Sequence, residues 1–215
     1  MAYSQGEDVS SARGLTATSF AILGLLAIRP WSTYELTRQM DRSLGRIWPR
    51  ATSKLYEEPK KLVDAGLAVA TSELVGRRPR TVYSITPTGR AALADWLHVP
   101  GEGPVLEFEQ LLKVWFSDHG TRGDALASLA AARAWAAERN EENKHAAAQY
   151  VAGEGPFQHR AAQAMLAGAF LTDFYALVAR WAEWATTEVA TWPDDPAEAT
   201  PDPDVIETVA RRADW

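Results

Sequence analysis

Apolar residues recur at helical spacing along most of the chain, after a polar start. A first helix is expected after Thr16 or Thr18, either of which can cap it, and Arg29-Pro30 ends it. A second helix is expected to start at Ser32 or Thr33. The core-facing residues of these two helices are predicted to be Phe20, Leu23, Leu26, Ala27, Leu36 and Met40.

The next stretch combines a helix with two strands. A helix is predicted over residues 52–64, with Leu55, Leu62 and Val63 toward one side, and Gly66 fits the left-handed residue that closes a helix. Two β-type runs follow, residues 67–74 and 81–86, and the turn over residues 75–80 holds three arginines in four positions. Three helices followed by a cationic hairpin predict a winged helix-turn-helix: the third helix enters the major groove of DNA and the hairpin, or wing, straddles the adjacent backbone.

The following segment predicts the end of this first domain. Pro87 suits the first turn of a fourth helix, whose inner residues are Ala91, Leu93 and Trp96. Residues 98–104 are dense in proline and glycine and show no apolar period, so a domain boundary is expected there.

The second half of the chain predicts helices and no strands. Helices are expected over residues 106–116, 124–151 and 157–191. From Trp192 onward, prolines among acidic residues predict a loose tail with a brief helix over residues 205–212. The predicted fold is therefore mainly α, with this organisation: a flexible arm (1–14), a winged helix-turn-helix DNA-binding domain (15–98), a linker (99–104), a helical dimerisation domain (105–191) and an acidic, proline-rich tail (192–215).

The charge of the chain is unevenly distributed. The net charge is −6, yet residues 13–90 hold thirteen Lys and Arg against six Asp and Glu. From residue 101 onward there are nine basic residues against nineteen acidic ones. Because the local field at a contact surface steers a polyanion, the acidic half does not exclude DNA binding by the basic half.

The composition also indicates the compartment. With 215 residues, of which 47% are hydrophobic, the chain can bury a core, and it contains no cysteine, which excludes disulfides and thiolate metal sites. The polar N-terminus lacks the apolar region of a signal peptide, and the run over residues 20–28 is too short to span a bilayer. A cytoplasmic protein without a membrane partner is expected.

Catalytic signals are weak. The four histidines, His98, His119, His145 and His159, are scattered, and no pair shows metal-ligand spacing on a helix. Asp118 and His119 are neighbours, but adjacent residues on a helix do not face each other. No phosphate-binding glycine loop or nucleophile elbow is present. We expect no enzyme, no metal site and no cofactor.

The residues predicted to contact DNA are polar or cationic and lie near the third helix or in the hairpin turn. Each has an ordinary alternative: the arginines can be a solvated hairpin tip, Ser53 a helix cap, Lys54 a surface charge, and Tyr56 a core residue with its hydroxyl at the surface. The full set is Arg50, Thr52, Ser53, Lys54, Tyr56, Lys60, Arg77, Arg78 and Arg80.

An apolar stripe lies in the last long helix, at spacings of four, three, four and three residues. Its members are Phe170, Phe174, Leu177, Trp181 and Trp184. This heptad-type pattern is typical of helix–helix packing, either within one chain or between the subunits of a dimer. A cleft between aromatic-rich helices can also bind a flat apolar effector. These interpretations stay open at the level of sequence.

Taken in order, several short motifs resemble the PadR family of bacterial transcriptional regulators, over roughly residues 18–190. The family commonly has Tyr-Pro in the middle of the recognition helix, whereas here Tyr56 is followed by Glu57-Glu58-Pro59, so the helix either kinks or starts later than residue 52. The motifs are Ala21-Ile22-Leu23-Gly24-Leu25-Leu26, Tyr34-Glu35-Leu36, Leu55-Tyr56, Leu62, Gly66-Leu67, Gly76-Arg77-Arg78, Tyr83-Ser84-Ile85-Thr86, Gly89 and Phe108-Glu109-Gln110-Leu111-Leu112-Lys113-Val114-Trp115-Phe116.

The resemblance implies more than the residue pattern does. It implies a homodimer that binds a double-stranded DNA operator and acts as a repressor, with an affinity that a small apolar or aromatic effector alters. A winged-helix protein-interaction module that does not bind DNA is the alternative, in which the basic wing meets an acidic partner.

Overall fold

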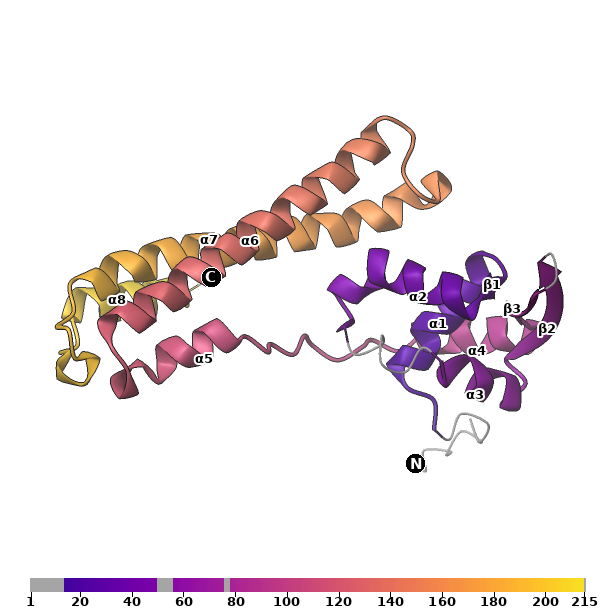
Figure 1. Cartoon of the computed structure of the whole chain (residues 1–215), viewed down its shortest axis with the longest axis horizontal. Coiled ribbons are helices and arrows are strands. Elements are labelled where there is room, and N and C mark those ends of the chain that lie inside the picture. Colours follow the sequence, from indigo (N-terminus) through magenta and orange to yellow (C-terminus); the bar gives the residue numbers. More distant parts are fainter. Residues whose placement is uncertain (1–13, 50–55, 76–77, 215) are drawn as a thin grey trace, which may run out of the picture. The chain divides into compact units, whose positions relative to one another are not determined.

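The computed structural model describes residues 14–49, 56–75 and 78–214, and the chain forms two compact units, Met1–Gly103 and Pro104–Trp215 (Figure 1). Helices dominate both units, and the strands all belong to one small sheet in the first. The expected fold class, a winged helix followed by a helical region, is confirmed.

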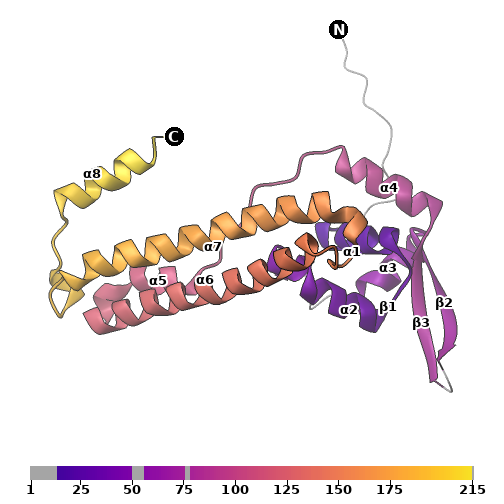
Figure 2. The ribbon, with the colours of Figure 1, turned by 90° about the horizontal axis from the view of Figure 1, so that it is seen from above.

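The N-terminal unit surrounds a three-stranded antiparallel sheet with the order β1-β3-β2. The hairpin of β2 and β3 is the wing, and it extends well past the two-residue β1 (Figure 2). The elements are α1 (Ala17–Ile28), β1 (Trp31–Ser32), α2 (Thr33–Arg42), the 3-10 helix η1 (Leu44–Arg46), α3 (Glu58–Asp64), β2 (Ala68–Val75), β3 (Arg78–Ile85) and α4 (Pro87–Leu97).

The first two helices begin at the predicted caps. Thr16 and Ser19 form a reciprocal capping box at α1, and Ser32 and Glu35 form one at α2. Of the predicted core-facing residues, Phe20 and Ala27 are only half-buried, and the Phe20 ring stacks on Trp96 of α4 with centroids 5.2 Å apart. The fully buried large side chains of the three helices that form the core are Ile22, Leu23, Leu26, Leu36, Met40 and Leu62.

The third helix begins later than predicted. Residues 50–55 lie outside the described residues; Tyr56 and Glu57 form a turn, and α3 starts at Glu58. Pro59 thereby falls in the first helical turn, where its missing N–H has no intrahelical acceptor to lose. The late start, which the sequence left as one alternative to a kink, is therefore what the structure shows for the described residues.

The wing also differs from the prediction in the residue at which its second strand begins. The second β run was expected to start at residue 81, which is wrong, because β3 begins at Arg78 and Arg80 pairs across the hairpin with Glu73. The strand β1, which pairs Trp31 with Tyr83 and Ser32 with Val82, was not predicted. Two residues are too few to show the alternation by which strands are recognised.

Helix α4 is set tightly against the base of the wing. Thr86 caps it by accepting a hydrogen bond from the Gly89 N–H at 2.9 Å. A Cβ atom at position 89 would overlap the backbone carbonyl of Leu67, the residue before β2. Only glycine therefore allows the first turn of α4 to approach the sheet this closely.

The C-terminal unit is built on two antiparallel 30-residue helices, α6 and α7, which lie side by side in both views (Figures 1 and 2). Helix α5 is shorter than the predicted 106–116, and α7 begins at Ala161 rather than 157, because Phe157 has a left-handed backbone (φ 53°) that precedes a 3-10 turn. The elements are α5 (Glu109–Trp115), η3 (Ser117–His119), α6 (Arg122–Val151), η4 (Gln158–Arg160), α7 (Ala161–Ala190), η5 (Pro196–Glu198) and α8 (Pro203–Arg212), the last confirming the brief helix expected in the tail.

Small side chains line much of the contact between α6 and α7. A buried polar residue, Asn143, crosses it by donating to the Gly168 carbonyl at 3.1 Å and to the Thr172 hydroxyl at 2.7 Å. By length and composition alone α7 could cross a membrane, but a core helix of a soluble protein passes the same test. The buried residues of the contact are Ala125, Leu129, Ala132 and Ala136 on α6 and Leu171, Tyr175, Val178, Ala182, Ala185 and Val189 on α7.

Candidate nucleic-acid interface

Helix α3 is held to α1 by a buried carboxylate. Glu58 is 1% exposed and accepts a 2.6 Å hydrogen bond from the Ser19 hydroxyl. Its other oxygen accepts a 2.7 Å bond from Lys61, and this bond raises the pKa of Lys61. With Pro59 and Leu62 also buried, the inner face of α3 is fixed, and Lys60 is left exposed on the outer side.

The described residues predicted to contact DNA are few. Tyr56, in the turn before α3, is 64% exposed, so the alternative of a core tyrosine does not apply. Lys60 is exposed, and Arg80 is half-exposed on β3. The others, Arg50, Thr52, Ser53, Lys54 and Arg77, lie outside the described residues, as does the side chain of Arg78.

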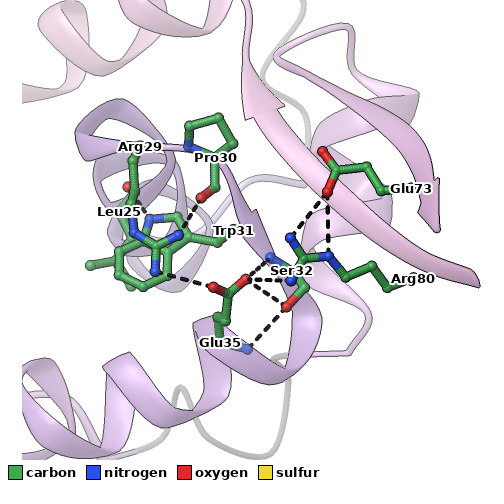
Figure 3. Close-up of polar contacts among 8 residues, drawn as sticks. All are labelled: Leu25, Arg29, Pro30, Trp31, Ser32, Glu35, Glu73 and Arg80. Carbon is green, nitrogen blue, oxygen red and sulfur yellow. Dashed lines mark hydrogen bonds and ion pairs between the residues drawn. The ribbon is translucent and has the colours of Figure 1, made fainter. Parts of the chain in front are cut away.

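Arg80 is engaged with two carboxylates (Figure 3). Its Nε and Nη2 atoms donate to Oε2 of Glu73, its cross-strand partner, at 3.3 and 3.0 Å. Its Nη1 atom lies 3.9 Å from Oε2 of Glu35, in the first turn of α2. Arg80 therefore lies on the flank of the wing and not at its tip, where the sequence had placed it.

Glu35 joins several elements at one point (Figure 3). Its Oε2 atom accepts from the Ser32 N–H at 2.9 Å and the Ser32 hydroxyl at 2.7 Å, while Oε1 accepts from Arg29 at 3.3 Å. The Ser32 backbone bond is the main cause that lowers the pKa of Glu35, followed by the Ser32 hydroxyl, with Arg29 adding a smaller effect. The carboxylate is thus ionised at neutral pH.

This role of Glu35 was not predicted, although the sequence carries a signal for part of it. Ser32 and Glu35 have the spacing of a capping box, which predicts the hydrogen bonds to Ser32. The contact with Arg80 joins residues 45 positions apart, and only the fold brings them together. Exposed Tyr34 and Arg38, on the outer side of α2, are further polar or aromatic candidates, with the Arg38 guanidinium 5.7 Å from the Tyr34 ring.

The apolar stripe of α7 lies beside the buried contact with α6, offset by one residue. Phe170 and Leu177 are 59% and 56% exposed. Phe174, Trp181 and Trp184 are half-buried and flank the α6–α7 core. Trp181 also meets Phe108 edge to face, and the Arg212 guanidinium of α8 lies 4.4 Å from the Trp184 ring centroid. Part of the stripe packs within the chain, and part faces outward.

No metal or catalytic cluster is found in the described part of the chain. It holds no group of three His, Cys, Asp or Glu side chains that could bind a metal ion. The His119 and Asp118 side chains lie 3.8 Å apart, and both are well exposed. Among the described residues, no third side chain forms a hydrogen bond that would orient either of them.

Comparisons with known proteins match both units. A family model described as the transcriptional regulator PadR-like family matches residues 22–95. The negative transcriptional regulator PadR of Bacillus subtilis is 34% identical over 109 residues, which are 49% of this chain and 59% of that protein. The probable transcriptional regulator Rv1176c of Mycobacterium tuberculosis is 36% identical over 85 residues, which are 39% of this chain and 45% of that protein. The aligned segments thus span less than two thirds of these relatives.

Solved structures extend the similarity in fold. Bacillus subtilis PadR in complex with operator DNA superposes with a TM-score of 0.71 at 23% identity, over 81% of this chain and 99% of that one. The same protein in complex with p-coumaric acid gives a TM-score of 0.64 at 22% identity, again over 81% and 99%. The family match over residues 22–95 runs from α1 through the wing to α4, so the winged unit of this chain is similar to the PadR-like family of transcriptional regulators.

Proposed function

We propose that the protein is a sequence-specific DNA-binding transcriptional regulator, whose winged N-terminal domain (residues 15–98) binds DNA. The observation that carries this is the PadR-like match over residues 22–95, on a fold shared with PadR solved on operator DNA. The basic excess of residues 13–90 supports it, because a phosphate backbone attracts a locally cationic surface. A protein-interaction module would not need that excess together with an exposed helix surface.

The proposed contacts fall into two groups. Around α3, Tyr56 and Lys60 are exposed on the side away from the core, and we assign base or phosphate contacts to the set Arg50, Thr52, Ser53, Lys54, Tyr56 and Lys60. At the wing, we assign phosphate contacts to Arg77 and Arg78, which the sequence places in the arginine-rich segment between the two β runs.

Two such modules are needed to cover a full operator. We propose that residues 105–191 form a homodimer, joined by a linker at 99–104 to the winged domain, with the outward part of the α7 stripe at or near the subunit contact. A two-fold dimer reads half-sites spaced by about one helical turn, roughly 34 Å.

Repression and effector control follow from the relatives. The Bacillus subtilis relative is described as a negative regulator and was solved with p-coumaric acid. We propose that this protein is a cytoplasmic repressor whose DNA affinity responds to a small apolar or aromatic molecule. A planar aromatic acid is the first probe to use.

The test is a binding titration of the purified full chain. A duplex selected from a random library and a scrambled duplex are titrated at several salt concentrations. Tight, salt-dependent binding with preference for the selected duplex supports the proposal. Addition of p-coumaric acid to the complex then tests whether the DNA affinity responds to a small aromatic molecule. Failure to enrich any duplex, at low salt and with or without the acid, would favour the protein-interaction module.

A further inference from the structure

Among the described residues, Glu35 and Arg80 form the one ion pair between the wing and the first turn of α2. We propose that Glu35 is a positioning residue for DNA binding, which fixes the angle of the wing through Arg80, and that Arg80 serves this link instead of contacting phosphate. This inference rests on the proposed DNA-binding function.

The wing needs such a link because its third strand is short. Strand β1 pairs with β3 only at Tyr83 and Val82, while the β2–β3 hairpin continues to the pair Val75–Arg78. Most of the hairpin is thus a two-stranded ribbon, which twists and bends more readily than a three-stranded sheet. Its angle to the helices decides where the arginines at its tip can reach.

Arg80 is placed to limit this bending. Side chains two residues apart on a strand share a face, so Arg80 lies on the same face of the sheet as Val82. Val82 pairs with Ser32, the last residue of β1, and Arg80 is therefore the next residue on this face toward the tip of the wing, where β1 no longer pairs with β3. The planar guanidinium meets Glu73 with one edge and Glu35 with another nitrogen. One side chain therefore ties both strands of the wing to α2.

The anchor on the α2 side is itself fixed. The same Oε2 atom of Glu35 that approaches Arg80 accepts two hydrogen bonds from Ser32, the residue that pairs with Val82. The carboxylate cannot follow a moving wing without breaking its cap. A flexible surface pair would lack this property.

The same surroundings argue against Arg80 as a phosphate contact. Two carboxylates flank one guanidinium, so the local charge that an approaching phosphate meets is not positive. If Arg80 did bind phosphate, removing it would lower the salt dependence of binding by about one ion.

The test combines Arg80→Gln, Glu35→Gln and the double variant in the full chain, measured on the duplex selected for the native protein. Glutamine at position 35 keeps an oxygen that can accept from Ser32, so the cap of α2 survives while the charge is lost. Each single variant is expected to weaken binding by about twofold to fivefold, as an exposed ion pair allows. The salt slope is expected to stay unchanged, and the double variant to be no weaker than either single one.

Arg29→Gln is the matched control. It removes the other cation that contacts Glu35 and leaves the wing link in place, so the affinity should stay at the native value. Losses that add in the double variant, or a salt slope reduced by about one in Arg80→Gln, would overturn the inference.

A second measurement separates this inference from the proposed function. Amide hydrogen exchange of the free protein is expected to quicken in β2 and β3 beyond Val82 for Arg80→Gln and Glu35→Gln, and not for Arg29→Gln. Unchanged exchange in both variants would refute the link even if the protein binds DNA. If the native protein bound no duplex, the proposed function would fail and the DNA-positioning role with it, whatever the exchange showed.

Discussion

The two units differ in the size of the apolar residues that they bury. The winged unit places its large side chains inside, and Leu23, Leu36 and Leu62 are fully buried at the meeting of its first three helices. In the helical unit, half of the buried apolar residues where α6 meets α7 are alanines, and many large side chains stay outside. Those exposed on α5 to α7 include Trp115, Phe116, Leu166, Phe170 and Leu177.

This difference is what we expect if the winged unit is complete within one chain and the helical unit is not. Alanines let two helices approach closely, but each buries little apolar area. Exposed aromatic and aliphatic side chains such as those on α5 and α7 are typical of a surface that binds a partner. The contrast supports the proposed dimer through the helical unit.

The largest expected effect comes from removing outward residues of the stripe. Phe170→Ala with Leu177→Ala should convert the proposed dimer to monomers, because both side chains are mostly exposed in one chain. Since the second half-site contact is then no longer intramolecular, DNA affinity should fall by about a hundredfold or more. Analytical ultracentrifugation and the binding titration measure this.

Val178→Ala is the control for this experiment, because Val178 faces α6 inside the chain. It should lower stability without directly changing the outward surface. A folded Phe170→Ala/Leu177→Ala variant that stays dimeric, with native DNA affinity, would show that this part of the stripe lies outside the interface.

A cavity in the winged unit should have the next largest effect. Leu62→Ala is expected to lower the free energy of unfolding by about 2–5 kcal/mol, because Leu62 is fully buried on α3. Val151→Ala at the end of α6 in the helical unit is the control, since Val151 is 89% exposed. Urea denaturation of the full chains compares them, and equal losses would contradict the contrast between the units.

A smaller effect is expected from Ser19→Ala. It removes the hydroxyl that donates to the buried Glu58 carboxylate, which should cost about 1–3 kcal/mol of stability. Because this bond ties α3 to α1, DNA affinity should fall as well, although neither residue is exposed. Ser72→Ala, at an exposed position on β2, should leave both quantities unchanged.

The smallest effect compares one helix cap from each unit. Glu35 caps α2 and Asp124 caps α6, and hydrogen bonds from Ser32 and Thr121 lower the pKa of the respective carboxyl. The resulting stability is present above their ordinary values of 4.5 and 3.8 and is lost as the pH falls through the lowered pKa. When denaturation is measured between pH 7 and pH 3, the free energy of unfolding should fall less in Glu35→Gln and in Asp124→Asn than in the native chain.

Local chemistry made much of this fold predictable. The candidate caps Thr16 and Ser32 placed the starts of α1 and α2, and the proline at position 87 placed the start of α4. They act within one helical turn, so no distant contact is needed to recognise them. The hairpin was predicted for the same reason, although the start of its second strand was placed too late.

The features that the sequence did not reveal depend on distant contacts. Strand β1 exists because β3 lies beside it, and Glu35 meets Arg80 because the wing folds back toward α2. On α7, two parallel apolar lines one residue apart share the same period, so spacing alone could not tell which one faces α6. Of the candidate site, the exposure of Tyr56 and Lys60 fits the prediction, and their contacts stay a prediction.

The missing side chain at Gly89 has a mechanical consequence. The first turn of α4 packs directly on the backbone just before β2, with no side chain between them. The Thr86 hydroxyl accepts a hydrogen bond from the Gly89 N–H and donates one to the Gly66 carbonyl. Helix α4 and the root of the hairpin are therefore expected to move together as one rigid body. A rotation of α4 would move the root of the hairpin with it, while the contacts of Arg80 with Glu35 and Glu73 resist that motion farther along the wing.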